Sequence, residues 1–597
     1  MTTSINVNKV SVESLLGSGK AKPFVIPEYQ RPYAWSDEQI ETLFEDLWEF
    51  TTASGGTDQD GSYFLGSIVS YENENGEQEI IDGQQRITSL FLLLRAIYTK
   101  LSNTPENERT EEAKNFIGKI QPAIWRTDKL NGKVDFEHIL LTSKVVNNEG
   151  NEILKTILKT GFADKNAKDN YSKNYCRFQD LLDKHSVENP LMVYQFIYAL
   201  LNQAIMLPIT ADSQDTALTI FSTLNDRGLP LSDSDIFKAK IYNHLQEADK
   251  KEFIERWKEL DNQATDANET IQQLFYYNMF YLRACENDTK STTPGIRKYY
   301  SEDKFRRLLS QDLLDNLFII LNLWKVVNKR EELENELWTK NEKILKSLDI
   351  LSSYPNEFWK YPVVIYYVRY RNDDNFEQGF EYFLNKLITM LITKYLMIPT
   401  INAVKQDVLK LNYAIVASCR PAFDFKEVEI AQLDSYIKTP NRNIVRMLLK
   451  ILAYEDSQQK KLLPVQWEIE HILPLKWQNN YFMNQSEIKE RIEHIGNKIP
   501  FEKKLNIIAG NGYFGKKKTQ YLQSNIAITH NLGESGLMNW DTDSIVERDI
   551  RISDSIKLIL NRWINEYTAF ASVEKMDSEP SVEDLTRIQE YKSKGWI

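Results

Sequence analysis

Cysteine is scarce in this sequence, and long apolar runs are missing. The three cysteines, Cys176, Cys285 and Cys419, stand far apart and show none of the paired spacings of zinc-binding modules. This pattern excludes a zinc finger and fits a reducing compartment. No apolar run reaches membrane-spanning length, because Arg95 and Lys394 interrupt the longest candidates. The N-terminus is polar and lacks the apolar region of a signal peptide. We therefore expect a cytoplasmic protein with no membrane partner.

A phosphate-binding signature and an excess of positive charge are also absent. The pattern G-x-x-x-x-G-K-[ST] does not occur, which excludes a Walker-type NTPase. The chain has 73 Lys and Arg against 85 Asp and Glu, a formal net charge of −12. That balance argues against a protein that coats nucleic acid without specificity, but it allows a local basic patch. Residues 489 to 521 contain eight Lys or Arg and three Glu, a local charge of +5.

The most informative stretch spans residues 467 to 521. Alternating apolar residues predict a strand over 467–471, which ends in the adjacent pair Glu470 and His471. Asn497 follows 26 residues after His471, and Asn506 nine residues later. A glycine-rich turn then leads into a helix-like run that carries three consecutive lysines: Lys516, Lys517 and Lys518.

These residue types suit metal-assisted hydrolysis of a phosphodiester. Neutral His471 can take a proton from water near pH 7, and Asn497 is predicted to hold its imidazole in the correct orientation. A carboxylate and an amide oxygen suit a magnesium ion, so Glu470 and Asn506 are the predicted metal ligands. The lysines would bind substrate phosphates without reading sequence.

The tripeptide Glu-His-Ile is not informative alone, because it occurs three times, starting at Glu137, Glu470 and Glu493. Only the second copy is closed by a proline and followed by Gly-Asn and Leu-Asn pairs. A structural or decayed copy is the alternative for that site. His138 and His494 are interpreted as ordinary surface or core histidines.

Two N-terminal segments place amide, guanidinium and carboxylate groups near a predicted turn. The first, Phe24–Trp35, contains two prolines and predicts an extended arm. Strands are predicted over 64–71 and 79–81, joined by a turn at Asn75-Gly76. The second segment, Asp82–Arg86 (D-G-Q-Q-R), follows the later strand and precedes an apolar helix.

Free N–H groups at such a helix start favour phosphate. Gly83 permits close backbone approach, and Arg86 can bind a phosphate through two N–H groups. A polar turn with a surface arginine is the alternative.

A third segment, Phe221–Gly228, reads F-S-T-L-N-D-R-G, and Asp235 and Lys238 continue it. Asn225 and Arg227 are predicted to face the same pocket as residues 82–86. The alternative is a structural turn in which Arg227 forms an ion pair. From about residue 250 to residue 425, helical periodicity dominates and no chemistry is evident.

The motifs resemble the GmrSD-type modification-dependent (type IV) restriction endonucleases. The arm and D-G-Q-Q-R match the signatures of that family's N-terminal domain, and residues 221–228 match a further one. Residues 470–518 look like its His-Me finger (HNH) nuclease module, with Glu470 where many such nucleases have Asp. The resemblance implies a ParB-like nucleotide site made by these residues: Gln30, Arg31, Asp82, Gly83, Gln84, Gln85, Arg86, Asn225 and Arg227.

We therefore expect a multidomain α+β protein: a ParB-like α/β N-domain, an all-α middle and a ββα-metal (HNH) nuclease C-domain embedded in helices. The predicted boundaries are 1–245, 246–429 and 430–570, followed by an acidic polar tail, 571–597.

The implied function is a nucleotide-gated DNA endonuclease or nickase acting on modified phage DNA, with Mg²⁺ or Mn²⁺ and GTP or ATP as cofactors. A nucleotide-responsive DNA sensor with weak nuclease activity and a toxin-like nuclease of RNA or unmodified DNA are the alternatives. The oligomeric state stays open, a homodimer being one option.

Overall fold

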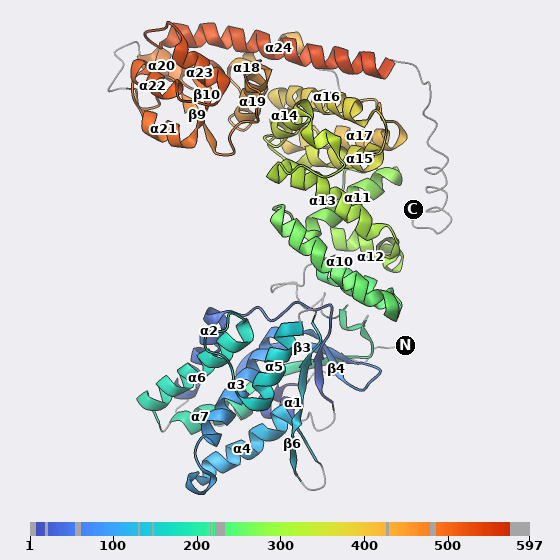
Figure 1. Cartoon of the computed structure of the whole chain (residues 1–597), viewed down its shortest axis with the longest axis vertical. Coiled ribbons are helices and arrows are strands. Elements are labelled where there is room, and N and C mark those ends of the chain that lie inside the picture. The colour runs from blue at the N-terminus through green and yellow to red at the C-terminus, as the bar shows by residue number, and fades with distance from the viewer. Residues whose placement is uncertain are drawn as a thin grey trace. The chain divides into compact units, whose positions relative to one another are not determined.

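The computed structural model forms two compact units, Met1–Ile254 and Glu255–Ile597 (Figure 1). The structure describes these residues: 8–17, 22–53, 61–128, 132–145, 148–190, 192–214, 216–218, 220, 233–425, 429–477 and 485–572. Within them, no helix combines the length and apolar character that crossing a bilayer requires.

The first unit is built on a six-stranded mixed sheet. Its strands are, in spatial order, β1 Val10–Ser11, β8 Ala204–Ala211, β3 Tyr63–Glu72, β4 Gln78–Asp82, β2 Phe24–Ile26 and β7 Leu141–Ser143. β3 and β4 are antiparallel, and Gly76 in the turn between them has φ 74°, which a glycine adopts without strain. The predicted hairpin is therefore confirmed. β3 also pairs in parallel with β8, from Tyr63↔Ala204 to Tyr71↔Ala211, although 130 or more residues separate the two strands in sequence.

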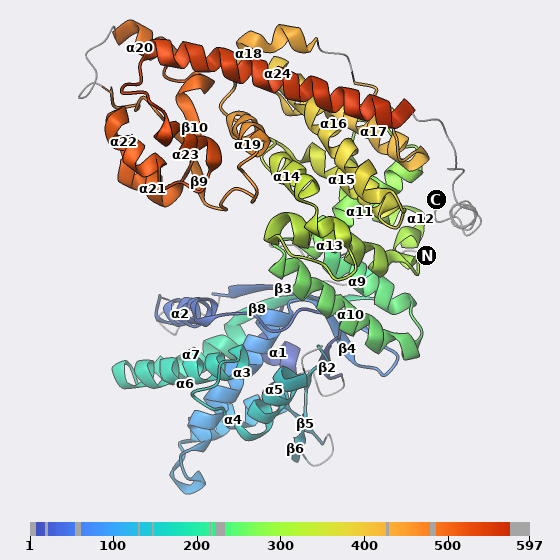
Figure 2. The same cartoon turned by 45° about the horizontal axis from the view of Figure 1, so that its top comes forward.

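Helices cover this sheet, and a small ribbon of two further strands extends from it (Figure 2). α3 begins directly after β4, and most of its buried residues are apolar. It packs against α4, α5 and α6. The ribbon strands are β5 Trp125–Thr127 and β6 Val134–Ile139. The helices are α1 Val12–Gly17, α2 Asp37–Ala53, α3 Gln84–Ser102, α4 Glu111–Ile124, α5 Asn148–Thr160, α6 Asn170–Glu188, α7 Met192–Tyr198 and α9 Asp233–His244, with α10 Glu247–Asp266 across the unit boundary.

The second unit is helical up to residue 466 in the ranges the structure describes, as the periodicity predicts. These helices are α11 Ile271–Cys285, α12 Ile296–Phe305, α13 Leu313–Lys329, α14 Glu342–Leu351, α15 Lys360–Tyr370, α16 Phe376–Met397, α17 Lys405–Ala417, α18 Asp434–Lys438 and α19 Val445–Glu455.

A small two-stranded sheet follows within the same unit. Its elements are β9 Trp467–His471, α20 Gln485–Arg491, the 3₁₀ turn η10 Ile495–Asn497, β10 Lys498–Glu502, α21 Lys503–Ala509, α22 Phe514–Tyr521, α23 Ala527–Glu534 and α24 Thr542–Ser572. Buried aromatic side chains of Phe501, Phe514, Tyr521 and Trp540 form part of the core beneath the sheet.

The long helix α24 contacts η10 at one end and α16 further along, so the helical region and the small sheet belong to one unit. The expected boundary at residues 429/430 lies inside this unit. The expected boundary at residues 245/246 lies close to Ile254. Residues 573–597, in the expected tail, lie outside the described ranges.

Candidate functional site

The pairing of β9 with β10 fixes the end of the strand that carries Glu470 and His471. The two strands are antiparallel, with Glu470 opposite Ile499 and His471 opposite Lys498. Just beyond the ladder, the Ile472 N–H donates to the Asn497 carbonyl at 2.9 Å. The strand end is therefore held by backbone bonds up to the point where the chain turns away.

Asn497 is a clamp for this turn. Its side chain is fully buried. The amide oxygen accepts from Leu473 N at 2.8 Å and Trp540 Nε1 at 3.2 Å, while Nδ2 donates to the carbonyls of Leu473 and Ile492 at 3.0 and 2.9 Å. The sequence predicts that this amide orients the His471 imidazole directly. All of the amide's partners are instead backbone groups or the indole. It positions His471 through the backbone.

Helix α24 holds η10 from the other side. The buried Asp549 carboxylate accepts from Gly496 N and lies against His494 Nδ1, both at 2.7 Å. Arg548 donates to the Gly496 and Lys498 carbonyls at 2.7 and 2.8 Å. A Cβ atom on Gly496 would lie 2.3 Å from the Ile545 carbonyl oxygen, so the close approach of α24 requires glycine here. The interpretation of His494 as a structural residue agrees with this contact.

Glu470 lies in a buried ion pair. Its Oε1 accepts from Lys517 Nζ at 2.6 Å and from the Tyr521 hydroxyl at 2.9 Å. Burial raises the pKa of Glu470, and the Lys517 ammonium opposes that rise. Burial lowers the pKa of Lys517, opposed by the same carboxylate. β9 and α22 are thus joined by two charges, each of which needs the other.

The imidazole of His471 lies beside a carboxylate that the motif does not predict. Its Nε2 lies 3.4 Å from Glu493 Oε2, and Lys498 Nζ lies 2.7 Å from the same oxygen. Burial lowers the pKa of His471, while Glu493 opposes this effect. The lowered pKa of His471 favours the neutral imidazole at pH 7. A carboxylate accepts hydrogen bonds, so the Glu493 contact favours the tautomer with its hydrogen on Nε2 and its lone pair on Nδ1. Glu493 is part of the third Glu-His-Ile copy, the one signal that could have drawn attention to it.

The N-terminal glutamines bind the arm to the strand-to-helix turn. Gln30 donates from Nε2 to the Ile81 carbonyl at 3.0 Å and accepts from Gln84 Nε2 at 3.1 Å. Gln85 accepts from Ala34 N at 2.7 Å and donates to the Pro32 carbonyl at 3.1 Å. The structure thus brings the two predicted segments together, and it uses their amide side chains for the junction itself.

The charged residues of this junction have different surroundings. Arg86 is partly buried and donates to the Ser67 carbonyl at 2.8 Å. Burial raises the pKa of Asp82 and lowers the pKa of Arg86, and each charge opposes the shift of the other. Gly83 precedes α3 with φ 90°, and that helix start has no side-chain cap. Arg31 lies 3.6 Å from Asp235 of α9.

Two family models match the chain in the regions that contain these two sites. Residues 12–242 match the N-terminal domain of the GmrSD restriction endonucleases, and residues 426–554 match their C-terminal domain. The chain belongs to the GmrSD restriction endonuclease family. No curated protein matches it. Membership makes it a restriction endonuclease with DNA as the substrate class, and places both candidate sites inside the two GmrSD domains.

The two predicted metal ligands of the GmrSD C-terminal domain, Glu470 and Asn506, have different hydrogen-bond partners. Asn506 donates from Nδ2 to Glu468 Oε2 at 3.1 Å, so its amide already has a carboxylate partner. Glu470 Oε1 accepts from two side-chain donors, Lys517 and Tyr521. Among the residues that the structure describes, no three His, Cys, Asp or Glu gather as a metal cluster. One carboxylate, one amide oxygen, water and substrate phosphate still fit Mg²⁺.

The three consecutive lysines have three different surroundings. Lys516 is exposed. Lys517 is buried against Glu470, which corrects its expected role as a contact to phosphate. Lys518 donates to the carbonyls of Ser535 and Leu537, so it closes the loop before α24. Helical geometry causes this division, because successive residues point about 100° apart.

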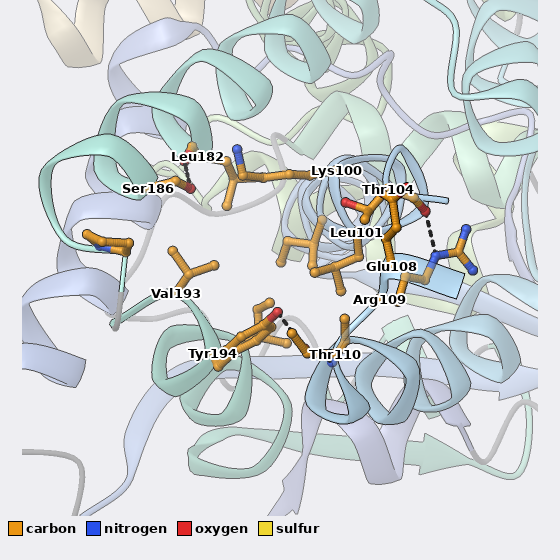
Figure 3. A pocket seen from close by; sticks show the side chains of 14 residues that line it. Lys100, Leu101, Thr104, Glu108, Arg109, Thr110, Leu182, Ser186, Val193 and Tyr194 are labelled. Atoms are coloured by element: carbon orange, nitrogen blue, oxygen red, sulfur yellow. Dashed lines mark hydrogen bonds between the residues drawn. The ribbon is translucent and has the colours of Figure 1, made fainter. Parts of the chain in front are cut away.

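In the GmrSD N-terminal domain, Asn225 and Arg227 lie outside the described residues. Asp235, which continues their segment, reaches Arg31 of the arm. A separate cavity of about 260 Å³ lies among α3, α4, α6 and α7 (Figure 3), and no predicted nucleotide-site residue lines it. Two of its polar side chains are already paired: Tyr194 with Thr110, and Arg109 with the Thr104 carbonyl.

The Glu470–Lys517 pair yields a stability prediction. Lys517→Met should lower the free energy of unfolding of the C-terminal unit by about 3–5 kcal/mol, because it leaves a buried carboxylate without its counter-ion. Lys516→Met, one residue earlier and exposed, should change it by no more than about 0.5 kcal/mol. Urea denaturation followed by tryptophan fluorescence compares the two. Equal stabilities would mean that the pair does not hold β9 to α22.

Proposed function

We propose that this GmrSD member is a nucleotide-gated, modification-dependent DNA endonuclease or nickase that acts against phage DNA. The observation that carries the proposal is the position of His471 at the end of β9, 3.4 Å from Glu493, inside the matched C-terminal domain. The N-terminal domain would bind and hydrolyse the nucleotide and sense the modification.

The proposed chemistry starts at His471 Nδ1. This nitrogen takes a proton from water, and the water oxygen attacks phosphorus while the bond to the leaving sugar oxygen breaks. Glu493 holds the opposite nitrogen, so the lone pair keeps one direction during the attack. The base is already deprotonated at neutral pH because burial lowers the pKa of His471. Below that pKa, the protonated ring would be inactive.

A magnesium or manganese ion would be held by Glu470 and Asn506. When bound, it would stabilise the negative charge that develops on the phosphate oxygens. Lys517 neutralises part of the Glu470 charge, so the site would bind the cation weakly by itself and more firmly together with substrate phosphate. Lys516 on the outer side of α22 would contact the phosphate backbone.

The nucleotide, GTP or ATP, would bind at the start of α3. The uncapped N–H groups of that helix and the guanidinium groups of Arg86 and Arg31 suit phosphate. Asp82, whose pKa burial raises, would be the acid–base group nearest to it. Gln30, Gln84 and Gln85 would shape the site by holding the arm.

Nucleotide and modified DNA would control cleavage through a two-state arrangement of the protein. The acidic chain lacks the overall charge to hold arbitrary DNA tightly at physiological salt. Differential binding to one state can supply the missing selectivity. Linkage then requires that nucleotide and modified DNA change each other's affinity by the same factor.

The nuclease assignment predicts the effect of His471→Ala. Loss of the general base should slow DNA cleavage about 10²–10⁴-fold while nucleotide hydrolysis stays unchanged. Plasmid cleavage with magnesium, with and without GTP or ATP, measures the effect. His138→Ala, in another Glu-His-Ile copy, is the matched control and should cleave normally. Full cleavage by His471→Ala would refute the site, and preference for RNA over modified DNA would refute the substrate.

The nucleotide assignment predicts the effects of Arg86→Ala and Asp82→Ala. Each should abolish nucleotide hydrolysis, and Arg86→Lys should restore only part of it because lysine cannot bind phosphate through two parallel N–H groups. Phosphate release measures the rate, and the exposed Arg126→Ala is the control. Normal hydrolysis by both alanine variants would show that residues 82–86 form a structural turn.

A further inference from the structure

Helix α21 exposes two large apolar side chains beside the proposed nuclease site. Ile507 and Ile508 are 70% and 57% exposed, while Ala509 on the opposite side is buried. Both isoleucines directly follow Asn506, one of the proposed metal ligands. α21 packs against β9, which carries Glu470 and His471, and against β10, so these strands occupy its inner side. The isoleucines therefore lie on the outer face of the same helix.

The same outer face is positively charged. Lys503 and Lys504 are exposed and lie one helical turn before Ile507 and Ile508, respectively, so each lysine neighbours an isoleucine. Tyr513, which is 54% exposed, directly precedes α22, and the exposed Lys516 lies in the first turn of that helix. Residues 503–519 contain five lysines and no acidic residue, in a chain whose net charge is −12. We call Lys503, Lys504, Ile507, Ile508, Tyr513 and Lys516 the α21 face.

We propose that the α21 face binds a DNA duplex and inserts Ile507 and Ile508 against the base pairs. Lysines alone would suit phosphate, but exposed isoleucines gain nothing from phosphate and need an apolar surface. Base steps offer such a surface when apolar side chains wedge between them from the minor groove. The flanking lysines neutralise the phosphates on either side. This inference rests on the proposed nuclease function and adds how the substrate is held next to His471.

Insertion of the isoleucines would also open the duplex at the cleavage position. Unstacking a base step bends the backbone and separates neighbouring phosphates. Because α21 also carries Asn506, the deformed step would lie next to the proposed metal ligands. The isoleucines would thus act on substrate geometry, and the lysines on affinity.

The experiment measures binding and base unstacking separately. The parent is the full chain with His471→Ala, mixed with a 30-base-pair DNA duplex that contains 2-aminopurine. Fluorescence anisotropy gives affinity at several salt concentrations, and 2-aminopurine fluorescence reports unstacking. In this background, Ile507→Ser/Ile508→Ser should bind at least about tenfold more weakly, with an unchanged salt slope, and should lose the fluorescence increase. Lys503→Gln/Lys504→Gln should lower the slope of log K against log salt by about 2 and keep the increase at saturation.

Matched controls use exposed residues elsewhere in the second unit. Leu558→Ser removes an apolar side chain that is 72% exposed on α24, and Lys340→Gln/Lys343→Gln removes two exposed lysines of the helical region. Both should bind as the parent does. Parent-like affinity or unstacking in the isoleucine variant would overturn the proposal, as would tighter binding of an RNA duplex than of DNA.

Cleavage by the wild-type chain, without His471→Ala, distinguishes this inference from the proposed function. If that chain cuts DNA and the isoleucine variant binds like its parent, only the assignment of the α21 face is wrong. If that chain cuts no DNA under any condition, the nuclease proposal is wrong, and the binding data still decide what the α21 face does.

Discussion

Asn497 has no exposed surface, and its side-chain amide makes four hydrogen bonds that join the end of β9 to the turn before β10. Leaving such buried groups without partners costs about 1–3 kcal/mol each. The rest of the C-terminal site depends on this constraint. It fixes the register in which His471 faces Lys498, and it fixes the turn from which Glu493 reaches the imidazole. Asp549 and Arg548 of α24 hold the same turn from outside.

The charged side chains of the C-terminal site include a buried pair and exposed lysines. The C-terminal site contains one buried pair, Glu470 with Lys517, whose function is to join two elements. The exposed lysines lie on the outer side of α21 and α22, where a substrate can reach them. At the N-terminal junction, amide side chains bind the arm, while Arg86 donates to the Ser67 carbonyl and Arg31 lies beside Asp235.

Local pattern predicts the elements of this protein well. The hairpin of β3 and β4, the helical middle and the strand ending at His471 all follow from spacing over a few residues. The family follows from the order of motifs. What the sequence does not reveal is which side chains pair across distance. Asp549 accepts a hydrogen bond from Gly496, 53 residues earlier in the chain, and no local feature of α24 predicts this contact.

The misassigned roles have the same cause. Asn497, Lys517 and Lys518 are recognisable as residues of the nuclease motif, but the motif does not say that the first binds backbone, the second a carboxylate and the third carbonyl groups. The structure brings the segments of Gln30, Gln84 and Gln85 together, but their bonds to each other and to the arm depend on how β4 meets α3. Side-chain function is decided by burial, which only the packed fold defines.

The central claim is that His471 is a neutral base whose Nδ1 is directed to the substrate. Nitrogen-15 NMR of labelled histidine tests it most directly, with the signal assigned by its loss in His471→Ala. The account predicts a pKa below 6.5 and a neutral ring protonated at Nε2. In Glu493→Gln the pKa should fall further, because the carboxylate that favours the charged ring is gone. A pKa at or above 6.5, or a ring protonated at Nδ1, would contradict the account.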